Sequence, residues 1–370
     1  MRLTAVAGHQ LGLEIEPGRR ALPTLAERAR GAAFLGLDVS RIVNAPESTG
    51  MSFWSINPYI GCEFGCAYCY ARDTHRWTTE RNHLAPTRPA REDFEHRIFV
   101  KRNAADVLRR TLDPTKVAGA SILIGTATDP YQPAERTFGI TRAILEAFLG
   151  YRGLSIRITT KSPLVARDAD LLARLGRRHR VSVNLSLISL DPALIRRLEP
   201  RTPLPHARLR GLRALAEAGV DTGLLIAPII PGLTDGWGAL GGLMAAGREA
   251  GARYADGFAL RLAPVARSGF LPVLAREFPE LVDRYRRHYG NRHHATQQYL
   301  DGLTARLRTL QKIHGFPVVA RSNPRTEAQA LSAGPSVAAP ADLLRGRLAA
   351  RRRRRPVPPV QPTDTALALI

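Results

Sequence analysis

Cysteine is scarce in this sequence, and its three cysteines, Cys62, Cys66 and Cys69, fall within one short stretch. An odd and clustered set cannot form the paired disulfide framework of a small secreted protein. The sequence also lacks any run of about 18 apolar residues, and its first residues show neither a charged segment followed by an apolar one nor a small-residue cleavage site. These absences predict a cytoplasmic protein with reduced thiols and no membrane segment.

Lysine is rare as well, and arginine supplies most of the 54 basic residues, which outnumber 32 acidic residues and give a net charge of +22. A field of this size favours polyanions such as nucleic acid, through contacts with phosphates. A GC-rich coding bias that enriches arginine throughout a chain explains the excess equally well. Charge alone therefore does not establish a nucleic-acid partner.

With 370 residues, 44% of them hydrophobic, the chain has room for a sizeable core in one large domain or two ordinary ones. Composition divides it into four segments. We predict a lead-in over 1–50 with a short helix near 23–35, a core over 51–265, a helical C-terminal extension over 266–334 and a Pro/Ala/Arg-rich tail over 335–370.

The tail is predicted to be mostly disordered around a short helix near 340–352, because it is rich in proline and alanine and poor in large apolar residues. It contains five consecutive arginines at 351–355. Such a run either binds nucleic acid or is simply a solvated terminal segment.

The core alternates short apolar runs with amphipathic stretches, several of which end at glycine as helices commonly do. The apolar runs are rich in β-branched residues and read as buried parallel strands. They lie at 52–59, 121–127, 154–160, 180–187, 221–230 and 254–262.

Six such units predict an α/β fold, a partial (β/α)6 TIM-type barrel, because right-handed crossovers feeding one twisted parallel sheet make it curl. Functional groups of such barrels lie on loops at the carboxyl ends of the strands. The three cysteines follow the first predicted strand, so we expect them on that face.

Residues 61–72 read GCEFGCAYCYAR, which is a C-x3-C-x2-C spacing with Gly61 and Gly65 where the loop must curl. A structural zinc site would need a fourth ligand, and His75 or His83 is the nearest candidate. A 4Fe–4S cluster normally takes four thiolates, so three cysteines would leave one iron open. An open iron can be chelated by the amine and carboxylate of S-adenosylmethionine (SAM).

With Tyr68 just before the third cysteine, this spacing resembles the signature of the radical S-adenosylmethionine superfamily, whose fold agrees with the predicted barrel. The stretches NPYIGCEFGCAYCYAR, GTATDPYQPAE, ITTKSPLVARDADLL, VNLSLISLD and EPRTP resemble the branch related to spore photoproduct lyase, also called DNA repair photolyase-like. These stretches span roughly residues 52–265.

The resemblance implies an enzyme whose three cysteines ligate a 4Fe–4S cluster of iron and sulfide. It also implies reductive cleavage of SAM to a 5′-deoxyadenosyl radical that abstracts hydrogen from a substrate. An electron donor such as flavodoxin or ferredoxin would reduce the cluster.

Further cofactor-binding residues are implied by the resemblance, mostly at the ends of predicted strands. Several have a structural alternative: Asp129 before Pro130 suits a turn, Lys161 precedes a helix start, and Ser186 suits a core hydroxyl. The implied set is Tyr68 beside the adenine, Thr126, Thr128 and Asp129 at polar parts of the cofactor, Lys161 at its methionyl carboxylate, Ser186 as a further hydroxyl, and Glu199 and Arg201 at the ribose or the rim.

The sequence departs from that branch where spore photoproduct lyase places a hydrogen-donating cysteine. The matching stretch carries Ala127 and Thr128, and the chain has no fourth cysteine, so thymine-dimer repair by that route is not predicted. Tyr70 and Tyr131 are the candidate catalytic donors in its place.

The substrate therefore stays open between a nucleic acid or modified base and a peptide or small metabolite. A hypothesis of another class is a nucleic-acid-binding module whose cysteines hold structural zinc. The strand pattern and the TDPYQP and TTKSP loops favour the radical enzyme, since a zinc module needs neither.

Residues 278–303 mix histidine, arginine and tyrosine. Such a mixture suits contact with a nucleic-acid backbone or stacking on a base. An amphipathic helix that closes the lower side of the barrel is the interpretation that we favour. The residues concerned are Tyr285, His288, Tyr289, His293, His294 and Tyr299.

Overall fold

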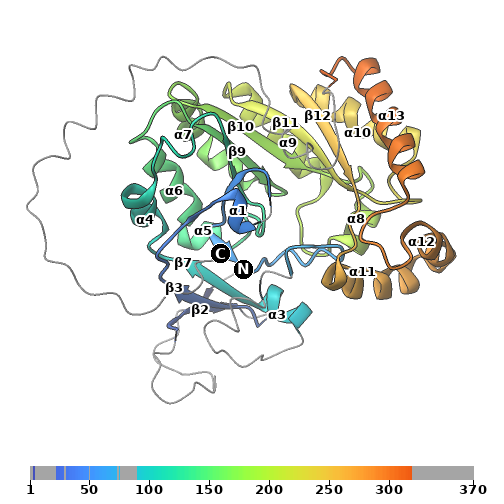
Figure 1. Ribbon diagram of the computed structural model, residues 1–370, viewed down its shortest axis with the longest axis horizontal. Helices are drawn as coiled ribbons and strands as arrows, with labels where there is room; N and C mark the ends of the chain where they lie inside the picture. The colour runs from blue at the N-terminus through green and yellow to red at the C-terminus, as the bar shows by residue number, and fades with distance from the viewer. Residues whose placement is uncertain are drawn as a thin grey trace, which may run out of the picture.

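The computed structural model describes residues 3–4, 22–28, 31–49, 51–72, 75 and 90–318. Within this part of the chain the main feature is a seven-stranded sheet (Figure 1). Its strands, from one edge to the other, are β12 (Tyr254–Ala259), β11 (Asp221–Ile229), β10 (Arg180–Ser186), β9 (Ser155–Thr160), β8 (Ser121–Ile124), β5 (Trp54–Ile56) and β4 (Val43–Asn44).

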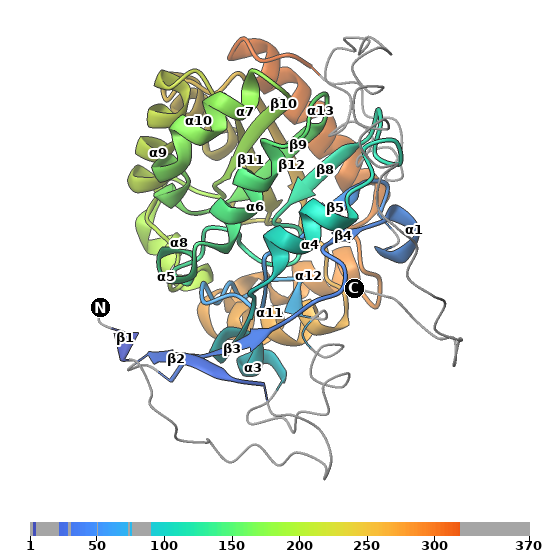
Figure 2. The same cartoon turned by 90° about the vertical axis from the view of Figure 1, so that its left-hand side faces the viewer.

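The strands from β5 to β12 pair in parallel, and β4 pairs antiparallel with β5 at one edge. Since β12 and β4 form the two ends of the order, the sheet is an open barrel within the described residues. The predicted partial (β/α)6 barrel is confirmed. Helices pack against the sheet between successive strands (Figure 2). They are α6 (Ile140–Phe148), α7 (Ala169–Gly176), α9 (Pro205–Glu217) and α10 (Trp237–Glu249).

Burial explains why these runs form strands. Every residue of β10 after Arg180 is buried, as expected for a central parallel strand covered on both faces. In β9 the residues alternate between buried and half-buried. The side chains from all these strands join one continuous apolar core with the helices outside them.

A second sheet lies beside the barrel, and the sequence did not predict it. Within the described residues its order is β1 (Leu3–Thr4), β2 (Thr24–Arg28), β3 (Ala33–Leu37), β7 (Arg97–Lys101) and β6 (Tyr59–Ile60). The helix predicted near 23–35 was therefore wrong. Its Ala, Leu, Glu and Arg favour a helix locally, but pairing of β3 with buried β7 overrides that preference.

Shorter helical elements connect these strands. Within the lead-in lies α1 (Pro46–Thr49), and β7 is flanked by α3 (Ala90–His96) and α4 (Ala104–Thr111). The loops on the carboxyl side of β8, β9 and β10 contain α5 (Glu135–Phe138), the 3-10 helix η1 (Pro163–Asp168) and α8 (Pro192–Leu198).

The predicted helical extension is present after β12. Up to residue 318, where the described part of the chain ends, it consists of α11 (Pro264–Glu277), η2 (Pro279–Leu281), α12 (Val282–Tyr289) and α13 (Gln297–Ile313). The tail over 335–370, with its predicted helix and arginine run, lies outside the described residues. The four segment boundaries stay a prediction.

The sequence favours one amphipathic helix over 278–303 on the lower side of the barrel, and this prediction is wrong. The stretch contains η2, α12 and the start of α13. The hydroxyl of Tyr285 donates to Pro231 O at 3.0 Å and that of Tyr289 donates to Leu260 O at 2.8 Å. Pro231 lies two residues beyond the carboxyl end of β11, and Leu260 directly follows β12, so α12 packs at the carboxyl face of the barrel. The two buried tyrosines need hydroxyl partners, and the carbonyls at the strand ends provide them.

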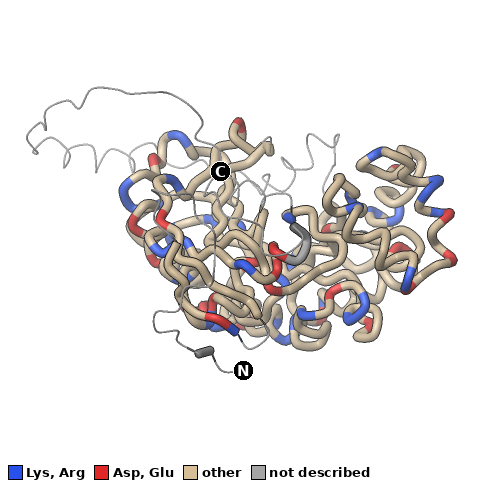
Figure 3. The backbone as a smooth tube through the Cα atoms, turned by 90° about the horizontal axis from the view of Figure 1, so that it is seen from below, with Lys and Arg blue, Asp and Glu red and all other residues tan. Residues whose placement is uncertain are grey.

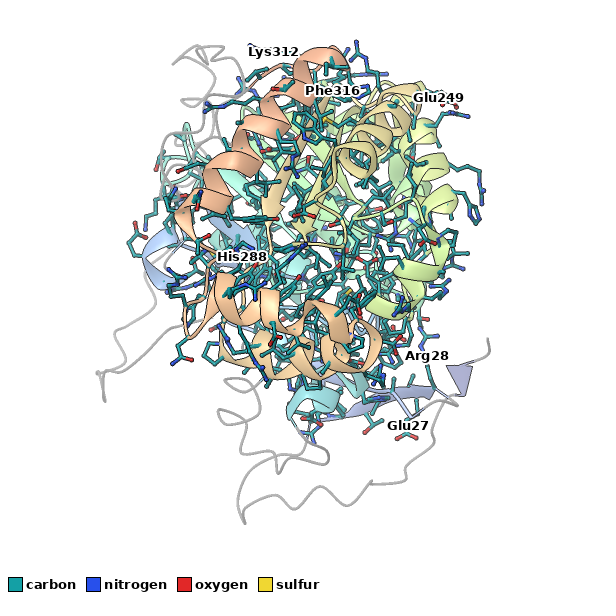
Figure 4. All side chains as sticks on the ribbon, turned by 90° about the vertical axis from the view of Figure 1, so that its right-hand side faces the viewer. Glu27, Arg28, Glu249, His288, Lys312 and Phe316 are labelled. Atoms are coloured by element: carbon teal, nitrogen blue, oxygen red, sulfur yellow. The ribbon has the colours of Figure 1, made fainter. Side chains whose placement is uncertain are left out.

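The last described helix, α13, runs along the edge strand β12. Figure 4 shows His288 near the start of this helix and Lys312 near its end. The side chain of Gln311 is buried, and its Nε2 donates to Ala255 O in β12 at 2.8 Å. Among the described helices, none combines the length and apolar character that crossing a bilayer requires.

Candidate iron–sulfur and cofactor site

The three cysteines lie on one loop that leaves β6 close to the carboxyl end of β5. Gly61 and Gly65 have φ angles of +87° and +68°, the left-handed region that glycine adopts without strain. A Cβ on Gly61 would lie 2.8 Å from the carbonyl oxygen of Phe94. The prediction that glycine lets this loop curl is confirmed.

The thiols of the loop differ in exposure. Those of Cys62 and Cys66 are buried, and Cys69 is half-buried. Burial raises the pKa of all three thiols, that of Cys66 to about 12. Burial thus disfavours the thiolates, and a metal that binds these sulfurs must displace their protons. Three soft sulfur donors on one loop, one of them half-buried, fit a cluster with three protein ligands.

The loop after β8 fastens the start of the cysteine loop. The hydroxyl of Thr128 donates to Gly61 O at 2.6 Å, and Gln132 Nε2 donates to the same oxygen at 3.1 Å. Gln132 Oε1 accepts the backbone N–H of Glu63 at 3.0 Å. The predicted residue Thr128 thus lies beside the first cysteine, but its hydroxyl is engaged with the backbone there.

The neighbouring residue Thr126 is held by Asn57, which directly follows β5. Asn57 Nδ2 lies 3.1 Å from Thr126 Oγ1, and Asn57 Oδ1 accepts the backbone N–H of Ala127 at 2.7 Å. The hydroxyl of Tyr70 donates to Thr126 O. These contacts bring the loop after β8 against the far end of the cysteine loop.

Asp129 is half-buried, and hydrogen-bond donors surround its carboxylate. Asp129 Oδ1 accepts the N–H of Tyr131 at 2.9 Å and the hydroxyl of Thr160 at 2.6 Å, while Oδ2 accepts the N–H of Lys161 at 2.7 Å. Burial raises the pKa of Asp129, and these hydrogen bonds oppose the rise. Asp129 therefore joins the ends of β8 and β9.

Lys161 follows β9 directly, and its Nζ lies 5.8 Å from the centre of the Tyr68 ring. Burial alone would lower the pKa of Lys161, but Cys66 and Glu199 raise it further than burial lowers it. Lys161 is therefore a cation within electrostatic range of a cysteine and of the aromatic residue that we assigned to the adenine. The structure brings these three predicted residues together.

Glu199 and Arg201 follow α8 and contact the cysteine loop from the opposite side. Glu199 Oε1 accepts the hydroxyl of Tyr68, and Arg201 Nε donates to Glu63 O. The resemblance implied that these two residues either contact a ribose or order the rim of the site. Their contacts with Tyr68 and Glu63 are of the second kind.

Ser186 and Tyr131 are engaged in the protein interior. Ser186 ends β10, and its hydroxyl donates to Ala227 O at 3.2 Å. The ring of Tyr131 is fully buried, and its hydroxyl donates to Asp168 Oδ2 at 3.1 Å. The other candidate donor, Tyr70, keeps 48% of its side chain exposed. Tyr70 is therefore the more accessible of the two tyrosines.

The two histidines considered as a fourth metal ligand do not complete a site in this structure. His75 is buried, with Nε2 at 2.9 Å from Arg97 O and Nδ1 at 3.7 Å from Asp93. His83 lies outside the described residues. In the part of the chain that is described, no group of three His, Cys, Asp or Glu side chains is arranged to hold a single metal ion.

Several residues of the site were missed from the sequence. Asn57 and Gln132 carried a usable signal, because each is a polar residue within a quoted motif and next to a proline. Arg72 had only its place at the end of the quoted cysteine stretch, and Arg208 had no signal, since it looks like any other arginine of a chain with 54 basic residues. Both are nevertheless among the largest fully buried side chains.

Comparison with known protein families gives one match to a family model, described as Radical SAM superfamily, over residues 56–238. Uncharacterised proteins are similar over a longer stretch. One from Mycobacterium tuberculosis H37Rv is 36% identical over 272 residues, which cover 73% of this chain and 77% of that protein. One from Methanocaldococcus jannaschii is 32% identical over 180 residues, which cover 49% of this chain and 61% of that protein.

Among solved structures, the fold is similar to that of spore photoproduct lyase. A mutant with bound AdoMet and dinucleoside spore photoproduct superposes with a TM-score of 0.54 at 18% identity, covering 77% of this chain and 80% of that chain. A complex of the lyase with the same dinucleoside gives a TM-score of 0.52 at 18% identity, covering 74% and 76%. At this identity the likeness is one of fold.

Proposed function

Because this chain belongs to the radical S-adenosylmethionine superfamily, we propose that it holds a 4Fe–4S cluster through Cys62, Cys66 and Cys69 and acts on a nucleic acid or a modified base. The observation that supports this is the placement of all three thiols on one loop at the carboxyl face of the barrel, with Cys69 half-exposed. When bound, the cluster and SAM would supply a 5′-deoxyadenosyl radical that abstracts hydrogen from substrate.

In this proposal the chain's own residues bind and orient the cofactor. Lys161 provides a positive charge for the methionyl carboxylate, and the ring of Tyr68 near its Nζ provides an apolar face for the adenine. Asp129 holds the backbone N–H of Lys161 and so fixes where that lysine leaves β9. Thr126, Thr128, Ser186, Glu199 and Arg201 shape the surrounding loops. An electron donor such as flavodoxin or ferredoxin would reduce the cluster.

The substrate assignment is supported by the charge at the carboxyl face. Desolvation by the surrounding protein and nearby Cys69 raise the pKa of Tyr70 to about 12, while Lys161 and Arg261 oppose that rise. Arg261 follows β12 and is exposed. Burial and the positive charge of Arg261 lower the pKa of His294, which lies on the loop between α12 and α13. A cation beside an exposed tyrosine suits a phosphate next to a stacked base.

Basic residues are not confined to this face. Figure 3 shows lysine and arginine interspersed with acidic residues along the whole tube. A long polyanion would therefore be attracted to much of the surface, whereas a specific substrate must reach the cysteine loop. A peptide or small metabolite remains the alternative substrate class for the same chemistry.

Tyr70 is the residue that we propose as hydrogen donor to a substrate radical. Its hydroxyl donates to Thr126 O in this structure and would first turn towards the substrate radical. The O–H bond would then break homolytically, the hydrogen atom would pass to the radical, and a tyrosyl radical would stay on Tyr70. One electron from the donor protein and one proton from water would restore the phenol. Exposure of the ring and the absence of a fourth cysteine from the chain support this role.

The first test is anaerobic reconstitution with iron and sulfide, followed by dithionite and SAM, with chromatography for 5′-deoxyadenosine. We expect that product even without substrate. Zinc in the protein as purified, together with no product after reconstitution, would favour the zinc-bound module instead.

A second test addresses the substrate. We expect single-stranded DNA or RNA oligonucleotides to raise the rate of 5′-deoxyadenosine formation and to lose hydrogen to it, which deuterated substrate would reveal as label in the product. Arg261→Gln should weaken this stimulation without changing the rate in the absence of oligonucleotide. Arg213→Gln, an exposed arginine on α9 that pairs with Glu249, is the matched control. Equal stimulation in both variants would exclude Arg261 from the contact, and no stimulation of the wild-type protein would direct the search to peptides and metabolites.

A further inference from the structure

A short segment crosses the cysteine loop and contacts its backbone. We call residues 198–208 the strap; they comprise the end of α8, the connection to α9 and the first turn of α9. The N–H of Ala67 donates to Leu198 O at 2.9 Å, and the N–H of Arg201 donates to Phe64 O at 3.3 Å. Arg201 Nε also donates to Glu63 O. The strap therefore holds the loop on both sides of Cys66.

The strap also holds the loop through a series of hydrogen bonds between buried side chains. Tyr68 donates its hydroxyl to Glu199, and Glu199 Oε2 accepts both Arg208 Nη2 and the hydroxyl of Thr202. Glu199 and Arg208 have no exposed surface, and Tyr68 has 5%. A tyrosine between two ligand cysteines is thus tied to a buried ion pair.

Arg208 anchors this chain to the barrel. Its Nη1 donates to Ser186 O, the last residue of β10, at 2.9 Å, and its Nε donates to Pro203 O at 2.8 Å. Burial alone would raise the pKa of Glu199, but Arg208 and Lys161 lower it below its ordinary value. Glu199 is therefore an anion at neutral pH, able to accept from Tyr68 and Arg208 together.

A second set of contacts lies on the outer side of the loop. Arg72 is buried and its Nη2 donates to Cys66 O at 2.9 Å. Arg72 and Arg201 both pair with the carboxylate of Glu95 in α3. The cysteine loop is therefore enclosed between the strap and α3, and Glu95 bridges the two.

The loop itself provides little regular structure. Inside it, the N–H of Cys69 donates to Cys66 O at 3.2 Å, and the turns at Gly61 and Gly65 favour no unique shape without outside contacts. Fixed ligand geometry requires side chains that are locked by their neighbours. Here those neighbours come from the strap.

We propose that the strap is a positioning element that holds the cysteine loop in its ligand-ready shape before any metal is present. The bond from Tyr68 to Glu199 and the contacts of Arg201 are its two grips, and Arg208 anchors it to β10. The cluster that the loop receives rests on the proposed function, whereas the order of the metal-free loop does not.

Hydrogen exchange measured by mass spectrometry on the metal-free full-length protein tests this proposal. Tyr68→Phe keeps the buried ring and removes its bond to Glu199. Arg201→Gln removes the side-chain contacts of Arg201 with Glu63 O and Glu95, while the backbone N–H of residue 201 still donates to Phe64 O. We expect exchange over 61–72 to become at least about fivefold faster in each variant, as loss of roughly one hydrogen bond implies, with exchange in β9 unchanged. Unchanged exchange over 61–72 in both variants, or an equal rise in β9, would overturn the proposal.

Two matched controls separate the strap from general stability. Tyr59→Phe removes another buried tyrosine hydroxyl, which donates to Glu135 at 2.6 Å outside the strap. Arg213→Gln removes an exposed arginine of α9. We expect wild-type exchange over 61–72 in both. A rise in these controls as large as in the strap variants would mean that the loop follows general stability, and would overturn the proposal.

Iron release from the protein reconstituted with iron and sulfide extends the test. After reconstitution, iron release to a ferrous chelator should be severalfold faster from Tyr68→Phe than from wild type. Equal release would overturn the link between loop order and cluster retention. A wild-type protein that takes up no iron would refute the proposed function, while hydrogen exchange on the metal-free protein would still decide on the strap.

Discussion

The hydroxyl of Thr128 lies 2.6 Å from the carbonyl oxygen of Gly61 and donates to it. This one contact links the loop after the second parallel strand to the residue that precedes the first cysteine. Through this hydrogen bond, the barrel of six parallel strands fixes the position of a loop that has little regular structure of its own.

Thr128→Val should therefore destabilise the protein by about 1–2 kcal/mol, because the substitution keeps the shape and removes both hydrogen bonds of the hydroxyl, the one to Gly61 O and the one that it accepts from Gln132 Nε2 at 2.9 Å. Gln132 Nε2 still donates to Gly61 O at 3.1 Å, so the carbonyl keeps a partner. Urea unfolding followed by circular dichroism would measure the change.

The control is Thr309→Val on α13, an exposed threonine whose hydroxyl donates to Ala305 O within the helix. We expect it to change the free energy of unfolding by less than about 0.5 kcal/mol. A Thr128→Val protein as stable as this control would show that the contact contributes nothing net.

Cys66→Ala should abolish iron binding and all formation of 5′-deoxyadenosine, because a cluster with three thiolate ligands does not survive the loss of one. Iron and sulfide analysis after reconstitution, with chromatography of the reaction, would check it. The far-ultraviolet circular dichroism of the metal-free variant should match wild type. Retention of both iron and activity would refute the ligand assignment.

Lys161→Ala should weaken binding of SAM about tenfold or more while leaving the iron content unchanged, since a charged group contributes roughly 1.5–3 kcal/mol through its hydrogen bonds. Equilibrium binding to the reconstituted protein would measure this. Lys116→Ala removes an exposed lysine and serves as the control. Equal affinity of both variants would assign Lys161 another purpose.

Lys101 at the end of β7 gives a prediction about pH. It is 3% exposed, and burial lowers its pKa from the ordinary 10.5 to about 8. Because the folded value lies below the unfolded one, this residue favours the folded state most above pH 10.5, and that contribution is lost as the pH falls through 8.

At pH 7, Lys101→Met should therefore stabilise the protein, by at most about 3 kcal/mol. The gain should shrink as the pH rises from about 8 towards 10.5. Urea unfolding across this range would measure it, with Lys312→Met at an exposed site of α13 as the control. A gain that does not depend on pH would refute the buried-charge explanation.

The barrel could be predicted from the sequence because its strands are long apolar runs between clear helix signals. The run at 180–187 coincides with β10, and the run at 221–230 coincides with β11. Burial on both faces of a parallel sheet forces such runs to be apolar, so composition alone marks them.

The small sheet beside the barrel could not be predicted in the same way. Residues 24–28 contain Leu, Ala, Glu and Arg, which favour a helix, and they form β2 through pairing with β3. The pairing of β3 with β7 joins residues more than 60 positions apart. Local composition contains no information about such a partner.

The candidate site was predicted where chemistry marks a residue and missed where only packing does. The cysteines stand out by type and spacing. The role of Glu199, in contrast, depends on Arg208 nine residues later, and nothing in the sequence distinguishes that arginine from the exposed ones on α9. Partners of buried charges become visible only in three dimensions.

The hydrogen bond from Gln311 to Ala255 has a consequence for solubility. Strand β12 ends the sheet order, and an uncovered edge strand is a template on which another chain can add a strand and start an aggregate. By covering β12 and occupying one of its carbonyls, α13 shields that edge. A chain cut before residue 297 would expose it, so the last described helix protects the protein against self-association as well as completing its core.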